Sequence, residues 1–160
     1  MGTFCLPESM KLVRVQTVVA CASFTLSDYI CCKNAHKVWF VIGHAGANAT
    51  TLTLGLTEAT AVAGGTAAAV TATFPIWKDI DHGTTSDALI KQTDAATLAI
   101  APTTDGACLA VFEWEPADHT AGYDCIAVSG SGGHANNTVW VMAFIDERYQ
   151  QGTPPTAITD

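Results

Sequence analysis

The stretch from residue 107 to residue 149 constrains the fold most strongly, because it reads as three successive β-strands. Along residues 107–115, alternate side chains form one wholly apolar face and a second face that includes Glu113 and Glu115, and Pro116 ends this pattern. Residues 123–129 resume a period of two before a glycine-rich break. Residues 137–145 are apolar at nearly every position, which is typical of a strand covered on both sides. We therefore expect the last segment to lie at the centre of the fold.

Short strand patterns recur about every ten residues through the rest of the chain. In residues 50–57, leucine and threonine alternate cleanly, which predicts a strand with one buried face. Eight or nine such strands with almost no helix predict an all-β fold, a single-domain β-sandwich of the jelly-roll type. The side chains predicted to be buried in its core are Leu52, Leu54, Phe112, Trp114, Val139 and Val141.

Three segments divide the 160 residues. Residues 1–22 form an N-terminal arm and first strand, residues 23–149 form the sandwich domain, and residues 150–160 form an extended tail. One short helix is expected near residues 64–70, because alanine favours helix and Thr66 can cap it. The tail lies either along a neighbouring subunit or against its own domain, and both alternatives stay open.

The composition excludes several kinds of partner. The net charge is −8, and the seven Lys and Arg residues form no cluster, so nucleic acid is not an expected partner. No stretch approaches the ~18 apolar residues of a membrane helix, so no membrane is expected either. Residues 10–21 superficially resemble a lipoprotein signal, but Arg14 and Gln16 interrupt the apolar run, which favours a strand.

No arrangement of residues typical of an enzyme is present in the sequence. It contains no nucleophile elbow, phosphate-binding loop or dinucleotide fingerprint, so we expect no enzymatic activity and no cofactor. Glu113 and Glu115 share a strand face, as in a two-carboxylate glycosidase, but paired outward glutamates are more often simply solvated. Adjacent cysteines on a strand point to opposite faces, so the set Cys31, Cys32, His36 and His44 does not predict zinc. The acidic segment from Asp79 to Asp87 lacks the calcium-loop pattern, and the remaining histidines, His82, His119 and His134, are expected in solvated turns.

Two segments carry a resemblance to a known family. Residues 112–128, together with Asp146-Glu-Arg-Tyr149, resemble a family of small tailed-bacteriophage virion proteins, and residues 33–40 resemble the beginning of a strand in the same family. Members of that family are minor structural or head-decoration proteins. The resemblance implies a non-enzymatic structural virion protein on the outer capsid surface, synthesised in the cytoplasm of a bacterial host. Its expected partners are the major capsid protein and further copies of itself, as a trimer by analogy with the local threefold positions of capsids. The alternative is a module associated with the phage tail or fibre, or a carbohydrate-binding β-sandwich.

Interface residues are predicted on the same basis. Trp77 is the expected anchor, because it follows Pro75 in a predicted edge strand and indoles dominate interfaces. Pro154 and Pro155 of the tail are the second candidates. Six cysteines are many for a chain with no export signal, and a reducing cytosol would keep them as thiols. We expect Cys5, and one of Cys31 or Cys32, to form inter-subunit disulfides after release. Cys108 and Cys125 should not bridge if residues 107–129 form a simple hairpin.

Overall fold

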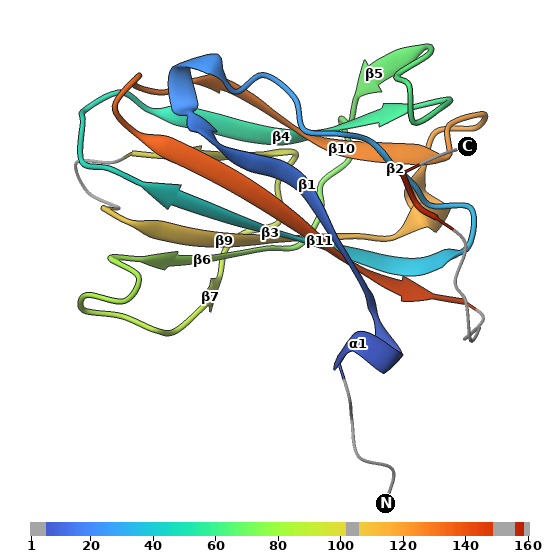
Figure 1. The fold of residues 1–160 in the computed structure, drawn as a ribbon, viewed down its shortest axis with the longest axis horizontal. Helices are drawn as coiled ribbons and strands as arrows, with labels where there is room; N and C mark the ends of the chain where they lie inside the picture. The colour runs from blue at the N-terminus through green and yellow to red at the C-terminus, as the bar shows by residue number, and fades with distance from the viewer. Residues whose placement is uncertain (1–5, 102–105, 149–155, 159–160) are drawn as a thin grey trace, which may run out of the picture.

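Two antiparallel β-sheets pack face to face in the computed structural model, which describes residues 6–101, 106–148 and 156–158 (Figure 1). The larger sheet contains, in spatial order, β1 (Lys11–Ala20), β11 (Thr138–Glu147), β3 (Ala35–Ala45), β9 (Cys108–Trp114), β6 (Ile76–Ile80) and β7 (Ile90–Lys91). The smaller sheet contains β2 (Ile30–Cys31), β10 (Cys125–Gly132), β4 (Leu52–Ala59) and β5 (Ala67–Ala69), and β8 (Thr97–Ile100) also pairs with β4. Short helical turns form α1 (Leu6–Ser9), η1 (Cys21–Ser23) and η2 (Pro116–Asp118).

The order in which the strands pair is that of a jelly roll. The first strand pairs with the last, β1 with β11, and the pairing continues inward with β2 and β10, β3 and β9, and β4 and β8, all antiparallel. Successive pairs of this nested series lie alternately in the larger and the smaller sheet, so the chain crosses repeatedly from one sheet to the other. The predicted all-β sandwich of the jelly-roll type is confirmed. The short strands β5, β6 and β7 are additions between β4 and β8.

The core lies between the inward faces of the two sheets. Side chains alternate in burial along β9 and β11, as the period-two pattern predicts. The ring centroid of Phe74 lies 5.1 Å from that of Phe112 and 6.3 Å from that of Trp114, and the three rings form an aromatic cluster within the core. All six predicted core residues are confirmed, with at most 2% of their surface exposed: Leu52, Leu54, Phe112, Trp114, Val139 and Val141.

The short helix predicted for residues 64–70 is wrong. Ala67–Ala69 form strand β5, which pairs with residues 57–59 of β4. Gly64 and Gly65 precede it with positive φ angles of 97° and 42°, in the left-handed region that glycine adopts easily. A run of three alanines is too short to nucleate a helix, so ladder hydrogen bonds to β4 outweigh the helical propensity of alanine.

Two further expectations about strand neighbours are wrong. Strand β6 is not at the edge of its sheet, because β7 pairs along its outer side. Pro75 is tolerated because it precedes β6 and needs no N–H, and its carbonyl accepts a 3.0 Å hydrogen bond from the amide of Glu113. Strands β9 and β10 do not form a hairpin, because they lie in different sheets. Consequently Cys125 lies opposite Cys31 on one side and Ala59 on the other.

Candidate functional site

A row of side chains crosses the outer face of the larger sheet from one edge to the other. Its members lie directly opposite one another in successive strand pairs, so they project from the same side of the sheet. The four central members are apolar and half-buried, and a cationic side chain stands at each end. In spatial order, the outer row is Arg14, Met142, Val41, Val111, Trp77 and Lys91.

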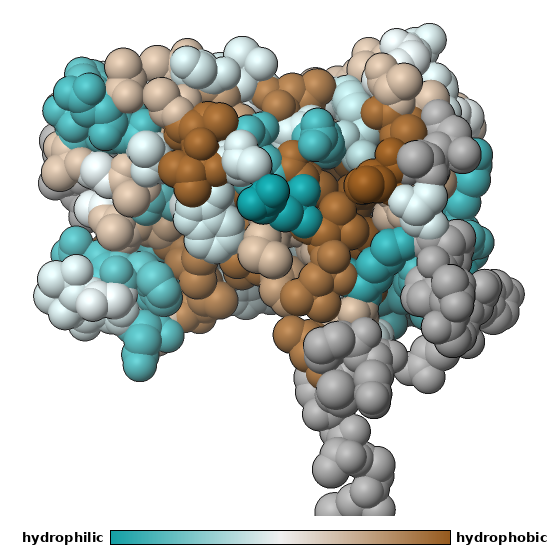
Figure 2. Space-filling model, in the orientation of Figure 1, coloured by the Kyte–Doolittle hydropathy of each residue, from teal (hydrophilic) through white to brown (hydrophobic). Residues whose placement is uncertain are grey.

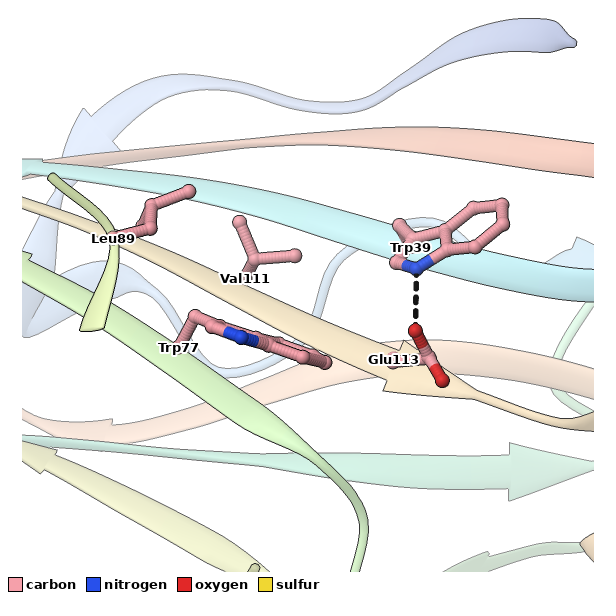
Figure 3. A pocket seen from close by; sticks show the side chains of 5 residues that line it. All are labelled: Trp39, Trp77, Leu89, Val111 and Glu113. Carbon is pink, nitrogen blue, oxygen red and sulfur yellow. Dashed lines mark hydrogen bonds between the residues drawn. The ribbon is translucent and has the colours of Figure 1, made fainter. Parts of the chain in front are cut away.

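A groove of about 380 Å³ opens beside this row, and Figure 3 shows the side chains that line it. Trp39 of β3 and Trp77 of β6 stand on its two sides, with Val111 of β9 between them. Leu89 and Glu113 complete the lining. The structure thus places Trp77, which the sequence predicts as an interface residue, in a surface groove together with Trp39 and Val111, and no local sequence pattern shows that these three residues meet.

Charged groups fix the position of Trp39. Its indole Nε1 donates a 2.7 Å hydrogen bond to Glu113 Oε2, and the Nζ of Lys37 donates one of the same length to Oε1 of that carboxylate. Burial raises the pKa of Glu113, but the hydrogen bonds from Lys37 and Trp39 outweigh it, and the net pKa is lowered. The hydrogen bond to Glu113 in turn raises the pKa of Lys37. The groove therefore contains an ionised carboxylate, which accepts one of these hydrogen bonds at each oxygen, beside an indole of fixed orientation.

This arrangement does not suit glycoside hydrolysis. A glycosidase needs one carboxylic acid that stays protonated, with a raised pKa, to protonate the leaving group. The pKa of Glu113 is lowered instead, and Glu115 lies 3.2 Å from the same Lys37 Nζ. The two glutamates share one lysine as their counter-ion, which favours a structural role for the pair.

A second depression, of about 320 Å³, lies on the same face over β1 and β11. Trp140 and Met142 line it together with four residues of β1, Arg14, Gln16, Thr17 and Val18. The indole of Trp140 lies over Gly43 of β3, where any Cβ would collide with the ring, so the glycine allows the indole to lie flat on the sheet. Figure 2 shows hydrophobic residues, with hydrophilic ones between them, on the side of the molecule where β1 and β11 face the viewer. Val18 of β1 is 65% exposed. Apolar surface therefore extends from the groove to the opposite edge of the sheet.

The other predicted site residues lie apart from this face. Cys31 and Cys32 project to opposite sides of β2, with Cys32 in the main core and Cys31 in a smaller cluster. Cys5, Pro154 and Pro155 lie outside the described residues. Ala157 of the tail is buried against the core of its own domain, and its carbonyl accepts a 2.8 Å hydrogen bond from the amide of Cys31. For this part of the tail, the structure shows packing on its own domain.

A buried polar chain joins the two sheets. The indole of Trp114 donates to Nε2 of His119 at 3.4 Å, and Nδ1 of His119 lies 3.3 Å from Oε2 of Glu58 in β4. The amide of Thr120 donates a further 3.0 Å bond to the same glutamate oxygen. The expectation that His119 is solvated is wrong, because only 6% of its side chain is exposed. Hydrogen bonds at both ring nitrogens fit a neutral imidazole that donates from Nδ1.

The buried hydrogen bonds between His119 and Glu58 should make the protein less stable in acid. Burial lowers the pKa of His119 below its ordinary 6.5, so the unfolded chain takes up this proton first as the pH falls. Burial raises the pKa of Glu58, but its hydrogen bonds with Thr120 and His119 outweigh this effect, so its net pKa lies below 4.5. The contributions of His119 and Glu58 to the free energy of unfolding are complete at a pH above the pKa that each group has in the unfolded chain. They are lost as the pH falls through the pKa that each group has in the folded protein. We expect the unfolding free energy, measured by urea titration, to decrease from about pH 7 to about pH 5. In the variant His119→Gln, this decrease should be smaller than in the parent protein. An equal decrease in both proteins would show that His119 is not a source of the acid sensitivity.

The acidic segment from Asp79 to Asp87, which begins within β6, contains a second histidine–carboxylate pair. Asp79 is buried, and its Oδ2 lies 2.6 Å from Nδ1 of His82. Hydrogen bonds lower the pKa of Asp79, with the larger effect from Ser86 and the smaller one from His82. Serine and histidine thus both bind the carboxylate, whereas a catalytic triad requires the serine to bind the histidine. Within the described residues, no three His, Cys, Asp or Glu side chains are arranged to hold a metal ion.

The comparisons with known proteins leave the family open. No protein-family model and no curated protein matches this chain. The resemblance to phage virion proteins therefore rests on the sequence motifs alone. Within the described parts of the chain, none of the helices has the length and hydrophobicity needed to span a bilayer.

Proposed function

We propose that this protein is a non-enzymatic structural protein of a phage virion that binds the outer capsid surface through the outer face of its larger sheet. The observation that supports the proposal is the apolar centre of the outer row, from Met142 to Trp77, on a protein of net charge −8. Contiguous apolar surface with a charged rim is typical of protein interfaces. The capsid as partner comes from the sequence resemblance. Assembly as a homo-oligomer, a trimer, is part of the same proposal.

The face is also rigid enough to act as a docking surface. Its aromatic anchors project from paired strands, and two of them are fixed further: Glu113 holds Trp39, and Gly43 provides a flat seat for Trp140. Side chains that are already ordered lose little conformational entropy on binding. Buried aromatic anchors surrounded by polar groups are the usual centres of binding energy.

One observation favours a second candidate, a carbohydrate-binding module. The groove places the indoles of Trp39 and Trp77 beside the carboxylate of Glu113. Aromatic surfaces with a few fixed polar groups are the elements from which small-ligand sites are built. A sugar ring could stack on an indole while its hydroxyls bind the carboxylate. This candidate uses the groove alone, whereas capsid binding uses the whole outer row.

A binding experiment separates the two candidates. The purified protein is titrated onto intact heads of the encoding phage that lack it, and separately with a panel of soluble polysaccharides. We expect saturable co-sedimentation with heads and no change in tryptophan fluorescence with any polysaccharide. Fluorescence quenching by a polysaccharide without binding to heads would replace the first candidate by the second. Failure in both arms would contradict both.

A further inference from the structure

Strands β2 and β10 place two cysteines directly opposite each other. Cys31 pairs with Cys125, and Ile30 pairs with Ile126, in antiparallel register. The amide of Cys32 donates a 2.7 Å hydrogen bond to the carbonyl of Asp124, the two residues that flank the cysteine pair. A flanking bond of this kind marks Cys31 and Cys125 as a non-hydrogen-bonded pair, in which opposite Cα atoms lie about 4.5 Å apart and side chains are closest. That spacing falls within the range that a disulfide can bridge.

The two thiols also project from the same side of the smaller sheet. Cys125 belongs to a small cluster on its outer face with Tyr29, Ala59 and Ala127, and Cys31 packs against that cluster. The neighbouring Cys32 is 2% exposed and belongs to the main core on the opposite side. Cys32 therefore cannot replace Cys31 as the partner of Cys125, because adjacent residues of a strand face opposite ways.

The two cysteines differ in their access to solvent. Cys31 is half-buried, whereas Cys125 is fully buried and its Sγ lies 3.3 Å from Oδ1 of Asp124. A small molecule can therefore reach Cys31 first. Cys125 can act only afterwards, from within the protein, on a sulfur already attached to Cys31.

We propose that Cys31 and Cys125 form an intramolecular disulfide when the folded protein meets a low-molecular-weight disulfide. The thiolate of Cys31 attacks one sulfur of the oxidant and releases its first thiol. Cys125, after losing its proton, attacks Sγ of Cys31 and releases the second thiol. The two protein thiols lose two electrons and two protons, and the oxidant is reduced to two thiols. The step depends on the fold alone and stands whether or not the protein binds a capsid.

The bond would fix the two-residue strand β2 to the centre of the smaller sheet. It closes a long loop, from residue 31 to residue 125, and long loops gain the most from cross-linking in the chain-entropy account. The amide of Cys31 also binds the carbonyl of Ala157, so the same bond would stabilise the attachment of the tail. It would also remove Cys31 from the inter-subunit disulfide that the sequence predicts, because one sulfur cannot serve both.

The test is oxidation of the full-length folded protein by oxidised glutathione, followed by alkylation and peptide mapping. We expect a peptide pair joined through residues 31 and 125, migration as a monomer without reductant, and a melting temperature raised by about 10 °C. Dithiothreitol should reverse all three. Cys32→Ala serves as the matched control and should still form the bond.

Two variants remove the bond selectively. Cys31→Ser changes the more accessible of the two cysteines, so the reduced protein should stay folded. It should abolish the cross-linked peptide and the rise in melting temperature. Cys125→Ala should do the same, with circular dichroism as the check on folding. The proposal is overturned if the folded protein joins Cys31 to another chain or to Cys32, or if oxidation leaves residues 31 and 125 alkylated.

Discussion

Replacing Phe112 by alanine is expected to lower the free energy of unfolding by about 3–5 kcal/mol. Phe112 is fully buried in the core, and its ring centroid lies 5.1 Å from that of Phe74. Truncation removes this contact and leaves a cavity that rigid strands cannot close. A single domain is typically stable by about 5–15 kcal/mol, so the loss should be visible as a large shift in the urea midpoint.

Leu109→Ala is the matched control for this variant. Leu109 lies on the same strand but is half-buried on the outer face, so its truncation should cost only about 1 kcal/mol. Both variants are followed by tryptophan fluorescence in urea. Equal losses for the two would show that the inward and outward faces of β9 have been assigned wrongly.

The sequence predicts the strands and the core well, because a strand that is buried on one face shows a local period-two pattern of apolar side chains. The alternation along residues 107–115 assigns Phe112 and Trp114 to one buried face. The alternation along residues 50–57 assigns the leucines of that strand to another buried face. Each assignment needs only the period of two, which any strand with one dry side shows. Residues 64–70 show the limit of local propensity, because their pairing with β4 decides their conformation.

The candidate site was only partly predictable. The sequence predicts Trp77 from an edge position that it does not have, and no local pattern marks Trp39 as its neighbour in a groove. The two indoles meet because β3, β9 and β6 are neighbours in the larger sheet. This neighbourhood joins segments far apart in the chain, and no local pattern records it. The outward phase of Val111 was visible in the alternation, but a position on an outer face does not by itself indicate a site.

The buried and paired polar groups show the same limit. His119 follows the short helical turn η2, where a histidine is normally solvated, and only the approach of Glu58 from the smaller sheet explains its burial. Similarly, Cys125 could be placed on a strand, but its partner depends on whether that strand pairs with β9 or with β2. The topology of the sheets decides which strands become neighbours, and it can bring together residues that are far apart in the sequence.

The second large effect is expected at the centre of the outer row. Val111 lies between Val41 and Trp77 in the sheet, so it would be buried at the middle of a docked interface. Val111→Asp would place a carboxylate there without a partner, beside the existing carboxylate of Glu113. Desolvating an unpaired charge costs several kcal/mol, which corresponds to a loss of affinity of at least about 100-fold.

Thr53→Asp is the matched control, because Thr53 is half-buried at the interior of β4 in the smaller sheet. Both variants should first show melting temperatures close to that of the parent protein. The measurement is their affinity for intact heads, by co-sedimentation at increasing protein concentration. We predict that Thr53→Asp binds like the parent protein, while Val111→Asp loses binding. Undiminished binding of Val111→Asp, with loss in Thr53→Asp, would contradict the assignment of the docking face to the larger sheet.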